Sequence, residues 1–215
     1  MTKMKKKYKI TLIILATFIV VCILGLILFQ FVLKPKKEEK PPITNTATIT
    51  NKIEGYDYTL DDRDTQIFEN LFQELKQNLE SSEIQEEEYA KTLAKLFIID
   101  LFTIDNKTSK YDIGGLEYIH SDAKESFRSK ILDTIYKTVE DNSDKGRKQE
   151  LPIVKTIEVI KFEKTTYKKE NTKEDAYEVE LSWTYEKDLG YDHKAKVIMI
   201  KEADKLSIIS YSKLP

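Results

Sequence analysis

The chain has 215 residues, with 35 basic and 37 acidic side chains, a formal net charge of −2, two histidines and one cysteine. A single cysteine excludes an intrachain disulfide, and because Cys22 lies inside an uncharged N-terminal run, the rest of the chain has no thiol for catalysis or metal binding. Leaving out the nine lysines and two glutamates of residues 1–9 and 34–40 gives 26 basic and 35 acidic residues. Such an acidic remainder lacks the clustered Lys and Arg of nucleic-acid-binding proteins, so we expect no nucleic-acid partner.

The N-terminal segment predicts a membrane anchor. Residues 10–33 carry no charge, and Thr11, Thr17 and Gln30 are their only polar side chains. At a helical rise of about 1.5 Å per residue this run spans about 36 Å, enough to cross a hydrocarbon core of about 30 Å. A cleavable signal peptide has a shorter apolar stretch and a small-residue cleavage site, neither of which is present. We therefore expect a retained single-pass helix in the lipid bilayer.

Lysines on both sides of this run bear on its orientation. Five lie in residues 1–9 and four in residues 34–40, and a short basic tail is harder to translocate than a long domain. This favours a cytoplasmic tail at 1–9 and an extracytoplasmic C-terminal domain at the cell membrane. Only three arginines accompany 32 lysines, a bias typical of AT-rich bacterial genomes.

Composition changes again after the apolar run. Residues 34–55 are rich in Lys, Glu, Pro, Thr and Asn and contain Pro35, Pro41 and Pro42, which favour extended conformations. We expect them to form a stalk. The remaining residues, 56–215, are long enough for one domain with its own core.

Three amphipathic helices are predicted at the start of this domain. The first is capped by Asp61 or Asp62, and the second begins at Ser82, where Gln85 completes a capping-box pattern. A third opens at Asp122, after the turn expected at Gly114 and Gly115. Their apolar faces, at spacings of three and four, comprise Ile67, Phe68, Leu71, Phe72, Leu75 and Leu79; then Tyr89, Leu93, Leu96, Phe97, Leu101 and Ile104; then Ala123, Phe127, Ile131, Ile135 and Val139.

The period changes to two in the C-terminal third. The segment "YEVELSWTYE" alternates apolar and polar residues from Tyr177 onward, which indicates a half-buried antiparallel strand. Further strands are predicted over residues 153–167, 194–203 and 206–214. Helices followed by an antiparallel sheet of about four strands predict an α+β fold.

This order of elements resembles the nuclear transport factor 2-like superfamily of cystatin-like α+β domains. Val179, Leu181 and Trp183 match an alternating strand found in its closing hairpin, whereas Leu206 and Ile208 stand where the last strand often has Trp and Ile. The resemblance implies three helices on a curved sheet. With a membrane stem, it also resembles subunits of bacterial secretion and conjugation machines, which implies a scaffold role.

No familiar nucleophile, nucleotide-binding or metal motif occurs, and neither a metal nor a cofactor is expected. Asp100 is the one catalytic candidate, because it falls beside the buried stripe of the second predicted helix. Enzymes of the superfamily that this chain resembles often place an acid or base inside a cavity, and a buried aspartate could act as a general base. The alternative is a carboxylate paired with a lysine or a backbone N–H. Tyr177, Trp183 and Tyr185 could line a ligand pocket, or they could belong to the core between sheet and helices.

Two functions remain open at this point. The chain could be a membrane-anchored interaction or scaffold protein of a secretion, conjugation or envelope complex, with protein partners or further copies of itself. Alternatively, it could be a small-ligand-binding domain or cavity enzyme that uses Asp100.

Overall fold

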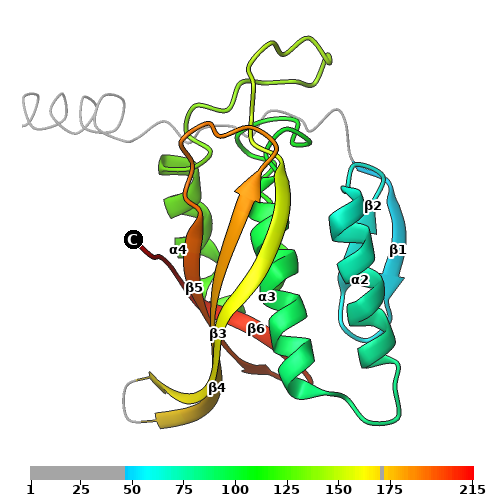
Figure 1. The fold of residues 1–215 in the computed structure, drawn as a ribbon, viewed down its shortest axis with the longest axis vertical. Coiled ribbons are helices and arrows are strands. Elements are labelled where there is room, and N and C mark those ends of the chain that lie inside the picture. Colours follow the sequence, from blue (N-terminus) through cyan, green and yellow to red (C-terminus); the bar gives the residue numbers. More distant parts are fainter. Residues whose placement is uncertain (1–46, 170–171) are drawn as a thin grey trace, which may run out of the picture. The chain divides into compact units, whose positions relative to one another are not determined.

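The structure is a computed structural model that describes residues 47–169 and 172–215. The predicted cytoplasmic tail, membrane helix and most of the predicted stalk lie outside these residues. Within them, no helix is both long and apolar enough to cross a membrane. The described part contains three α-helices, a four-stranded antiparallel sheet and a two-stranded sheet (Figure 1). The predicted α+β class is therefore confirmed.

A β-hairpin precedes the first helix. Strand β1 (Ile49–Ile53) pairs antiparallel with β2 (Tyr58–Asp61), and Gly55, with φ of +83°, lies in the turn between them. The prediction that the stalk extends to residue 55 is thus wrong for its last part. The Thr- and Asn-rich composition resembles a linker, but Ile53 is 1% exposed and belongs to the core, so folded structure begins before residue 56.

Two helices follow, close to their predicted positions. Helix α2 (Gln66–Leu79) buries the predicted face, but its N-cap is Thr65, since Asp61 belongs to β2. Helix α3 (Glu86–Phe102) begins four residues after the predicted Ser82. The connection is held differently from a capping box: Asn78 of α2 accepts a hydrogen bond from Gln85 N at 2.8 Å and donates one to Gln85 O at 3.0 Å.

Helix α4 (Ser121–Asp133) follows the 3₁₀ turn η2 (Leu116–Tyr118). Its N-cap is His120, whose Nδ1 accepts a hydrogen bond from Asp122 N at 3.1 Å, so the predicted start at Asp122 is one residue late. The helix ends before Ile135 and Val139, yet Val139 is still buried in the segment that follows.

The main sheet has the strand order β3-β4-β5-β6. Its strands are β3 (Val154–Lys169), β4 (Thr172–Tyr185), β5 (Lys194–Glu202) and β6 (Lys205–Lys213). The predicted alternation in β4 is confirmed, because Val179, Leu181 and Trp183 are buried while Glu178, Ser182 and Thr184 are more exposed. The β3–β4 hairpin continues past the end of its pairing with β5 at Ala176 and extends away from the other strands (Figure 1).

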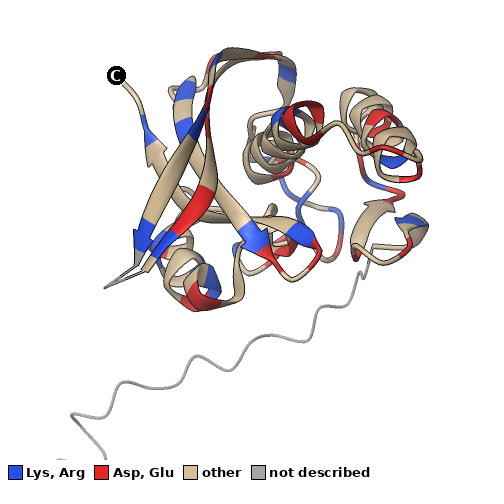
Figure 2. Cartoon of the chain, turned by 90° about the horizontal axis from the view of Figure 1, so that it is seen from below, with Lys and Arg blue, Asp and Glu red and all other residues tan. Residues whose placement is uncertain are grey.

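The helices form two layers over one face of the sheet. Helix α3 packs against β3 and β4, α4 packs against β6, and α2 packs on α3 beside the β1–β2 hairpin (Figure 1). Lysines and acidic residues are interspersed along the strands of the sheet (Figure 2). On the solvent face of the sheet, for example, Glu178 lies 3.4 Å from Lys196 and 4.0 Å from Lys161.

Candidate functional site

Asp100, the predicted catalytic candidate, lies in the last turn of α3 with both carboxylate oxygens engaged. Its Oδ1 accepts a hydrogen bond from Lys107 Nζ at 2.5 Å, and its Oδ2 accepts one from Gly115 N at 2.5 Å. The Lys107 side chain is 5% exposed and that of Asp100 is 18% exposed. This arrangement matches the alternative to a catalytic role that the sequence left open for Asp100, a carboxylate paired with a lysine or a backbone N–H.

Gly114 and Gly115 make this arrangement possible. A Cβ on Gly114 would lie 1.9 Å from Asp100 O, closer than any side chain can approach a carbonyl. Gly115 has φ of +79°, a conformation that favours glycine, and its position lets its N–H point at the carboxylate. The predicted turn at these glycines is confirmed, and it serves to bring the backbone against the end of α3.

An ionic network surrounds the Asp100–Lys107 pair, and we define it as Asp61, Arg63, Asp64, Asp100, Lys107, Asp112 and Glu117. Arg63 lies 2.7 Å from Asp112 and 3.3 Å from Asp61. The Asp64 carboxylate accepts a hydrogen bond from Asp61 N at 2.8 Å, and Glu117 accepts from Thr59 N and Oγ1. The network therefore ties β2 and the segment before α2 to the end of α3 and the loop that follows it.

Burial changes the titration of several members of this network. Burial raises the pKa of Asp64 to about 7, and the charges of Asp61 and Asp100 add to this effect. The pKa of Glu117 is also raised to about 7, mainly by burial and then by the charge of Asp100. Burial alone would lower the pKa of Lys107, but the adjacent Asp100 outweighs it and raises that pKa. Two carboxyl groups of the network thus titrate near neutral pH, above the ordinary range of a carboxyl group.

This network is placed to hold the fold together. A surface hollow of about 530 Å³ is lined by Arg63 and Lys107 but not by Asp64, Asp100 or Glu117. A general base needs to reach a substrate proton directly or through one water molecule, and the Asp100 oxygens are directed at Lys107 and Gly115 instead. Within the described ranges, no three His, Cys, Asp or Glu side chains are placed to bind one metal ion.

The three aromatic candidates on β4 are divided between two places. Trp183 is 3% exposed, packs on Phe102 with ring centroids 4.9 Å apart, and donates its indole N–H to the Tyr185 hydroxyl at 2.8 Å. Tyr185 in turn donates to Asp192 O at 2.7 Å. These two residues form a satisfied part of the core, as in the second of the two predicted readings.

Tyr177 lies apart from them, where β4 meets the first turn of α3. Its hydroxyl donates to the Glu86 carboxylate, which also accepts a hydrogen bond from Lys201 at 2.6 Å. Its ring stacks on Phe162 with centroids 5.8 Å apart. These contacts fasten the base of the β3–β4 hairpin to α3. The structure therefore does not bring the three aromatic residues together around one pocket.

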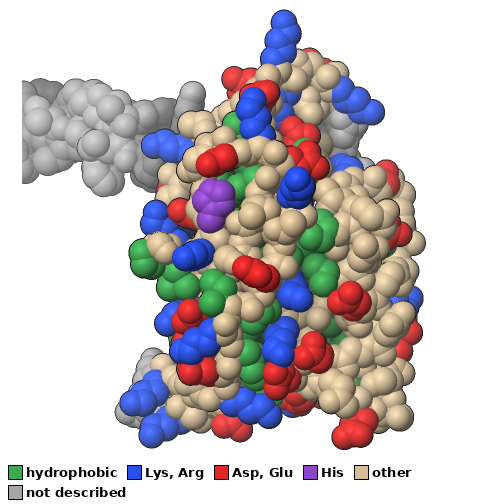
Figure 3. Space-filling model, viewed as in Figure 1, with side chains coloured by type: hydrophobic (Ala, Val, Ile, Leu, Met, Phe, Trp, Pro, Cys, Tyr) green, Lys and Arg blue, Asp and Glu red, His purple; other side chains and the backbone are tan. Residues whose placement is uncertain are grey.

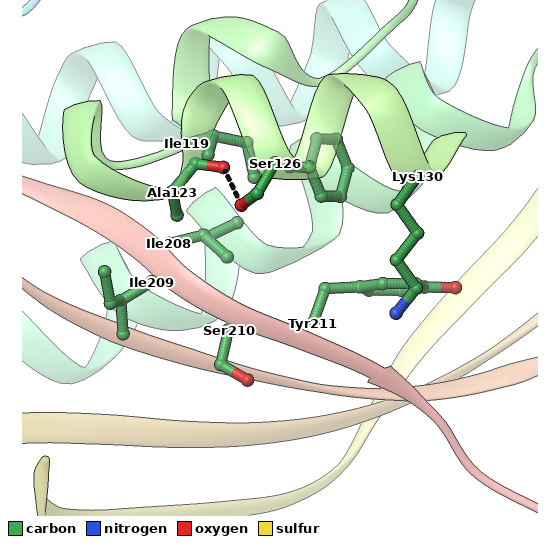
Figure 4. Close-up of a pocket in the computed structure, with 9 residues that line it drawn as sticks. Ile119, Ala123, Ser126, Lys130, Ile208, Ile209, Ser210 and Tyr211 are labelled. Atoms are coloured by element: carbon green, nitrogen blue, oxygen red, sulfur yellow. Dashed lines mark hydrogen bonds between the residues drawn. The ribbon is translucent and has the colours of Figure 1, made fainter. Parts of the chain in front are cut away.

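A groove that the sequence did not predict lies between α4 and β6 (Figure 4), and we call it the α4–β6 groove. It encloses about 230 Å³ and is lined by Ala123, Ser126, Phe127 and Lys130 of α4, by Ile208 to Tyr211 of β6, and by Ile119. Its floor is largely apolar: Phe127 is 8% exposed and packs edge-on against Tyr211, with ring centroids 6.2 Å apart.

Two polar groups in this groove have no partner within the described part of the chain. The Lys130 side chain reaches from α4 toward Tyr211 (Figure 4), and it forms no ion pair with residues 47–169 or 172–215. The Tyr211 hydroxyl is buried and has no hydrogen-bond partner among the same residues, and burial raises its pKa. A buried hydroxyl without a partner is uncommon in a folded protein. The groove thus combines an apolar floor with an unpaired cation, while the unpaired Tyr211 hydroxyl is closed to solvent.

Hydrophobic side chains are scattered over the rest of the described surface. On the face shown in Figure 3, hydrophobic side chains are interrupted by charged ones. The large hydrophobic residues that are well exposed in the described ranges, Ile49, Ile84 and Ile160, belong to β1, the loop before α3 and β3. Other hollows, of about 530, 460 and 380 Å³, are larger, so the α4–β6 groove is a candidate for contact with another molecule because of its apolar floor and its unpaired Lys130.

Comparison with protein-family models, with curated proteins and with solved structures gives no match for this chain.

Proposed function

We propose that this chain is a single-pass membrane protein, with a cytoplasmic tail and an extracytoplasmic interaction or scaffold domain of the nuclear transport factor 2-like type. Its anchor is residues 10–33, and its partners belong to a secretion, conjugation or cell-envelope complex. The uncharged run between two lysine clusters supports the anchor. Helices packed on one face of a four-stranded sheet support the relation to that superfamily.

One observation carries the interaction role. The only catalytic candidate, Asp100, is fixed between Lys107 and Gly115, whereas the α4–β6 groove presents an apolar floor and the exposed Lys130, which forms no ion pair within the described residues. An apolar surface beside an unpaired cation gains free energy when a partner covers the surface and supplies the opposite charge. Binding is thus better supported than catalysis.

The alternative function, a ligand-binding or cavity enzyme based on Asp100, has one supporting observation. Asp64 and Glu117, with pKa values raised to about 7, lie in the same network and could exchange protons at neutral pH. For catalysis, a substrate would have to displace Lys107 from a side-chain environment that is almost closed to solvent. We therefore favour the interaction role.

Cross-linking in intact cells tests this role. Cells that produce the full chain with a C-terminal tag are treated with a membrane-impermeant amine-reactive cross-linker, and the tagged chain is purified from solubilised membranes. We expect cross-linked species that contain other envelope proteins and that reproduce between preparations. Recovery of the monomeric chain alone would contradict a scaffold role, and recovery of multiples of its own mass alone would indicate homo-oligomerisation instead.

A further inference from the structure

The α4–β6 groove follows a strand edge that is only partly covered. In its first half, the Leu206 carbonyl accepts a hydrogen bond from the Tyr58 hydroxyl at 2.9 Å, and Leu206 N donates to the Tyr89 hydroxyl at 3.0 Å. Ile208 O then accepts from His120 N at 2.9 Å. These contacts satisfy the outward-facing backbone groups of β6 as far as Ile208.

The register of β5 and β6 shows which later groups face outward. Leu214 N donates to Lys194 O, so this opposed pair is hydrogen-bonded. Hydrogen-bonded and non-hydrogen-bonded pairs alternate in an antiparallel ladder. Lys196–Ser212 is therefore bonded, while Val197–Tyr211 and the pair between Ala195 and Lys213 are not. The backbone N–H and C=O groups of Tyr211 and Lys213 consequently point away from β5, toward the free edge.

The start of α4 explains why this edge is open. Ile119 forms a parallel bridge with Ile208, and a chain that continued as a strand would pair with the rest of β6. Instead, His120 caps α4 at Ser121, and the helix passes over β6 (Figure 4). A groove of about 230 Å³ remains, with helix α4 on one side and the unpaired edge of β6 on the other.

These features select the chemistry of an occupant. Outward N–H and C=O groups at alternate residues match an extended peptide backbone, and an apolar floor suits alternate apolar side chains. Lys130 is the only charged residue in the lining, and it has no acidic partner in the described ranges, so it complements a carboxylate.

We propose that the α4–β6 groove binds an extended peptide segment of a partner protein, which pairs with β6 at Tyr211 and Lys213 and places an acidic side chain or a C-terminal carboxylate at Lys130. The inference rests on the proposed interaction function and names the kind of partner. Strand addition provides affinity through backbone hydrogen bonds, while the apolar floor and Lys130 provide specificity.

The test uses the full chain in phosphatidylcholine nanodiscs and a displayed library of short random peptides. We expect selected peptides to share alternating apolar residues and an acidic residue, and synthetic copies to bind the wild type. Ser126→Trp should fill the groove and weaken binding by about tenfold or more, the loss of about 1.4 kcal/mol. Ser129→Trp is the matched control, since Ser129 is an exposed serine of α4 that does not line the groove, and it should leave binding unchanged.

Two further tests, one on the peptide and one on the protein, report on the mode of binding. Two forms of the peptide are compared, one with the odd-numbered amides N-methylated and one with the even-numbered amides N-methylated. Only one of the two should lose affinity, because only one set of N–H groups faces β6. Lys130→Glu should weaken the binding of an acidic peptide. Lys137→Glu makes an equal charge change on an exposed lysine outside the groove and should leave that binding unchanged.

Four outcomes would overturn the inference. The selection could yield no peptide that binds the wild type more tightly than Ser126→Trp, or the peptides could bind Ser126→Trp and Ser129→Trp equally well. Peptide affinity could also be unchanged by N-methylation, or unchanged by Lys130→Glu. A wild type that is dimeric while Ser126→Trp is monomeric would assign the groove to a second copy of the chain. A negative peptide result together with cross-linked envelope partners would refute the groove assignment and leave the proposed function intact. Peptides that bind the groove, in the absence of any cross-linked envelope partner, would support the groove assignment and contradict the proposed function.

Discussion

Replacement of Lys107 by methionine is the most informative stability experiment. Methionine keeps the apolar length of the lysine side chain and removes the amino group 2.5 Å from Asp100. Because these side chains are 5% and 18% exposed, the substitution leaves a carboxylate in a largely buried site without its cation. Breaking such a pair from one side costs about 3–5 kcal/mol. Gly115 N still solvates the carboxylate, so we expect the lower end of that range.

A loss of about 3 kcal/mol corresponds to about a 150-fold increase in the unfolding equilibrium constant and a fall in Tm of about 6–12 °C. Urea unfolding of the full chain in detergent, followed by fluorescence of Trp183, measures it, since this single tryptophan lies in the core. Lys187→Met is the control: its pair with Glu150 is mostly exposed, with side chains 62% and 67% accessible, so the free energy of unfolding should hardly change.

A double variant separates charge from packing. Asn at position 100 can still accept the Gly115 N–H bond but carries no charge, so Asp100→Asn combined with Lys107→Met should regain most of the lost stability. The reasoning is refuted if Lys107→Met is no more destabilising than Lys187→Met, or if the double variant is as unstable as the single one.

The network and the core give three more expectations. Because the folded-state pKa values of Asp64 and Glu117 are raised to about 7, the folded state should lose about 1–2 kcal/mol of stability per group as pH rises from 5 to 8. Thermal unfolding at each pH should show this slope for the wild type and a flat profile for the Asp64→Asn, Glu117→Gln double variant. Gly114→Ala should lower Tm by more than about 6 °C, because its Cβ would clash with a carbonyl, whereas Gly146→Ala, which meets only a flexible carboxylate, should not. Tyr185→Phe should cost about 1–3 kcal/mol in chemical denaturation, because it leaves a buried indole N–H without an acceptor; an unchanged unfolding midpoint would contradict that hydrogen bond.

Local periodicity predicted the helices and the main sheet because each has one buried face. The spacing from Ile67 to Leu79 gives α2 almost to the residue, and the alternation from Val179 to Trp183 gives the buried face of β4. Periodicity failed for β1, whose Thr and Asn residues resemble a linker and whose partner strand lies beyond a turn. Helix starts shifted because the residue that caps each helix depends on the turn before it, as at His120.

The candidate sites depend on long-range placement, which explains why the sequence predicted them only in part. Asp100 was predicted from its helical phase, but its partner Lys107 follows the end of α3, in a loop where a lysine is expected to be exposed. The α4–β6 groove arises from strand order and from the end of the bridge at Ile119. No local pattern indicates that β6 is an edge strand, although the adjacent isoleucines at 208 and 209 interrupt its alternation where the bulge occurs.

Cysteine labelling in intact cells tests the central proposal, an anchored chain with its domain outside the cytoplasm, most directly. In a Cys22→Ser background, one cysteine is placed at Ser129, exposed on α4, or at Thr2 in the N-terminal tail, and cells are treated with a membrane-impermeant maleimide. We predict that the Ser129 position reacts in intact cells and that the Thr2 position reacts only after permeabilisation. The reverse pattern, or a chain that is recovered from the culture medium without residues 1–33, would contradict the account.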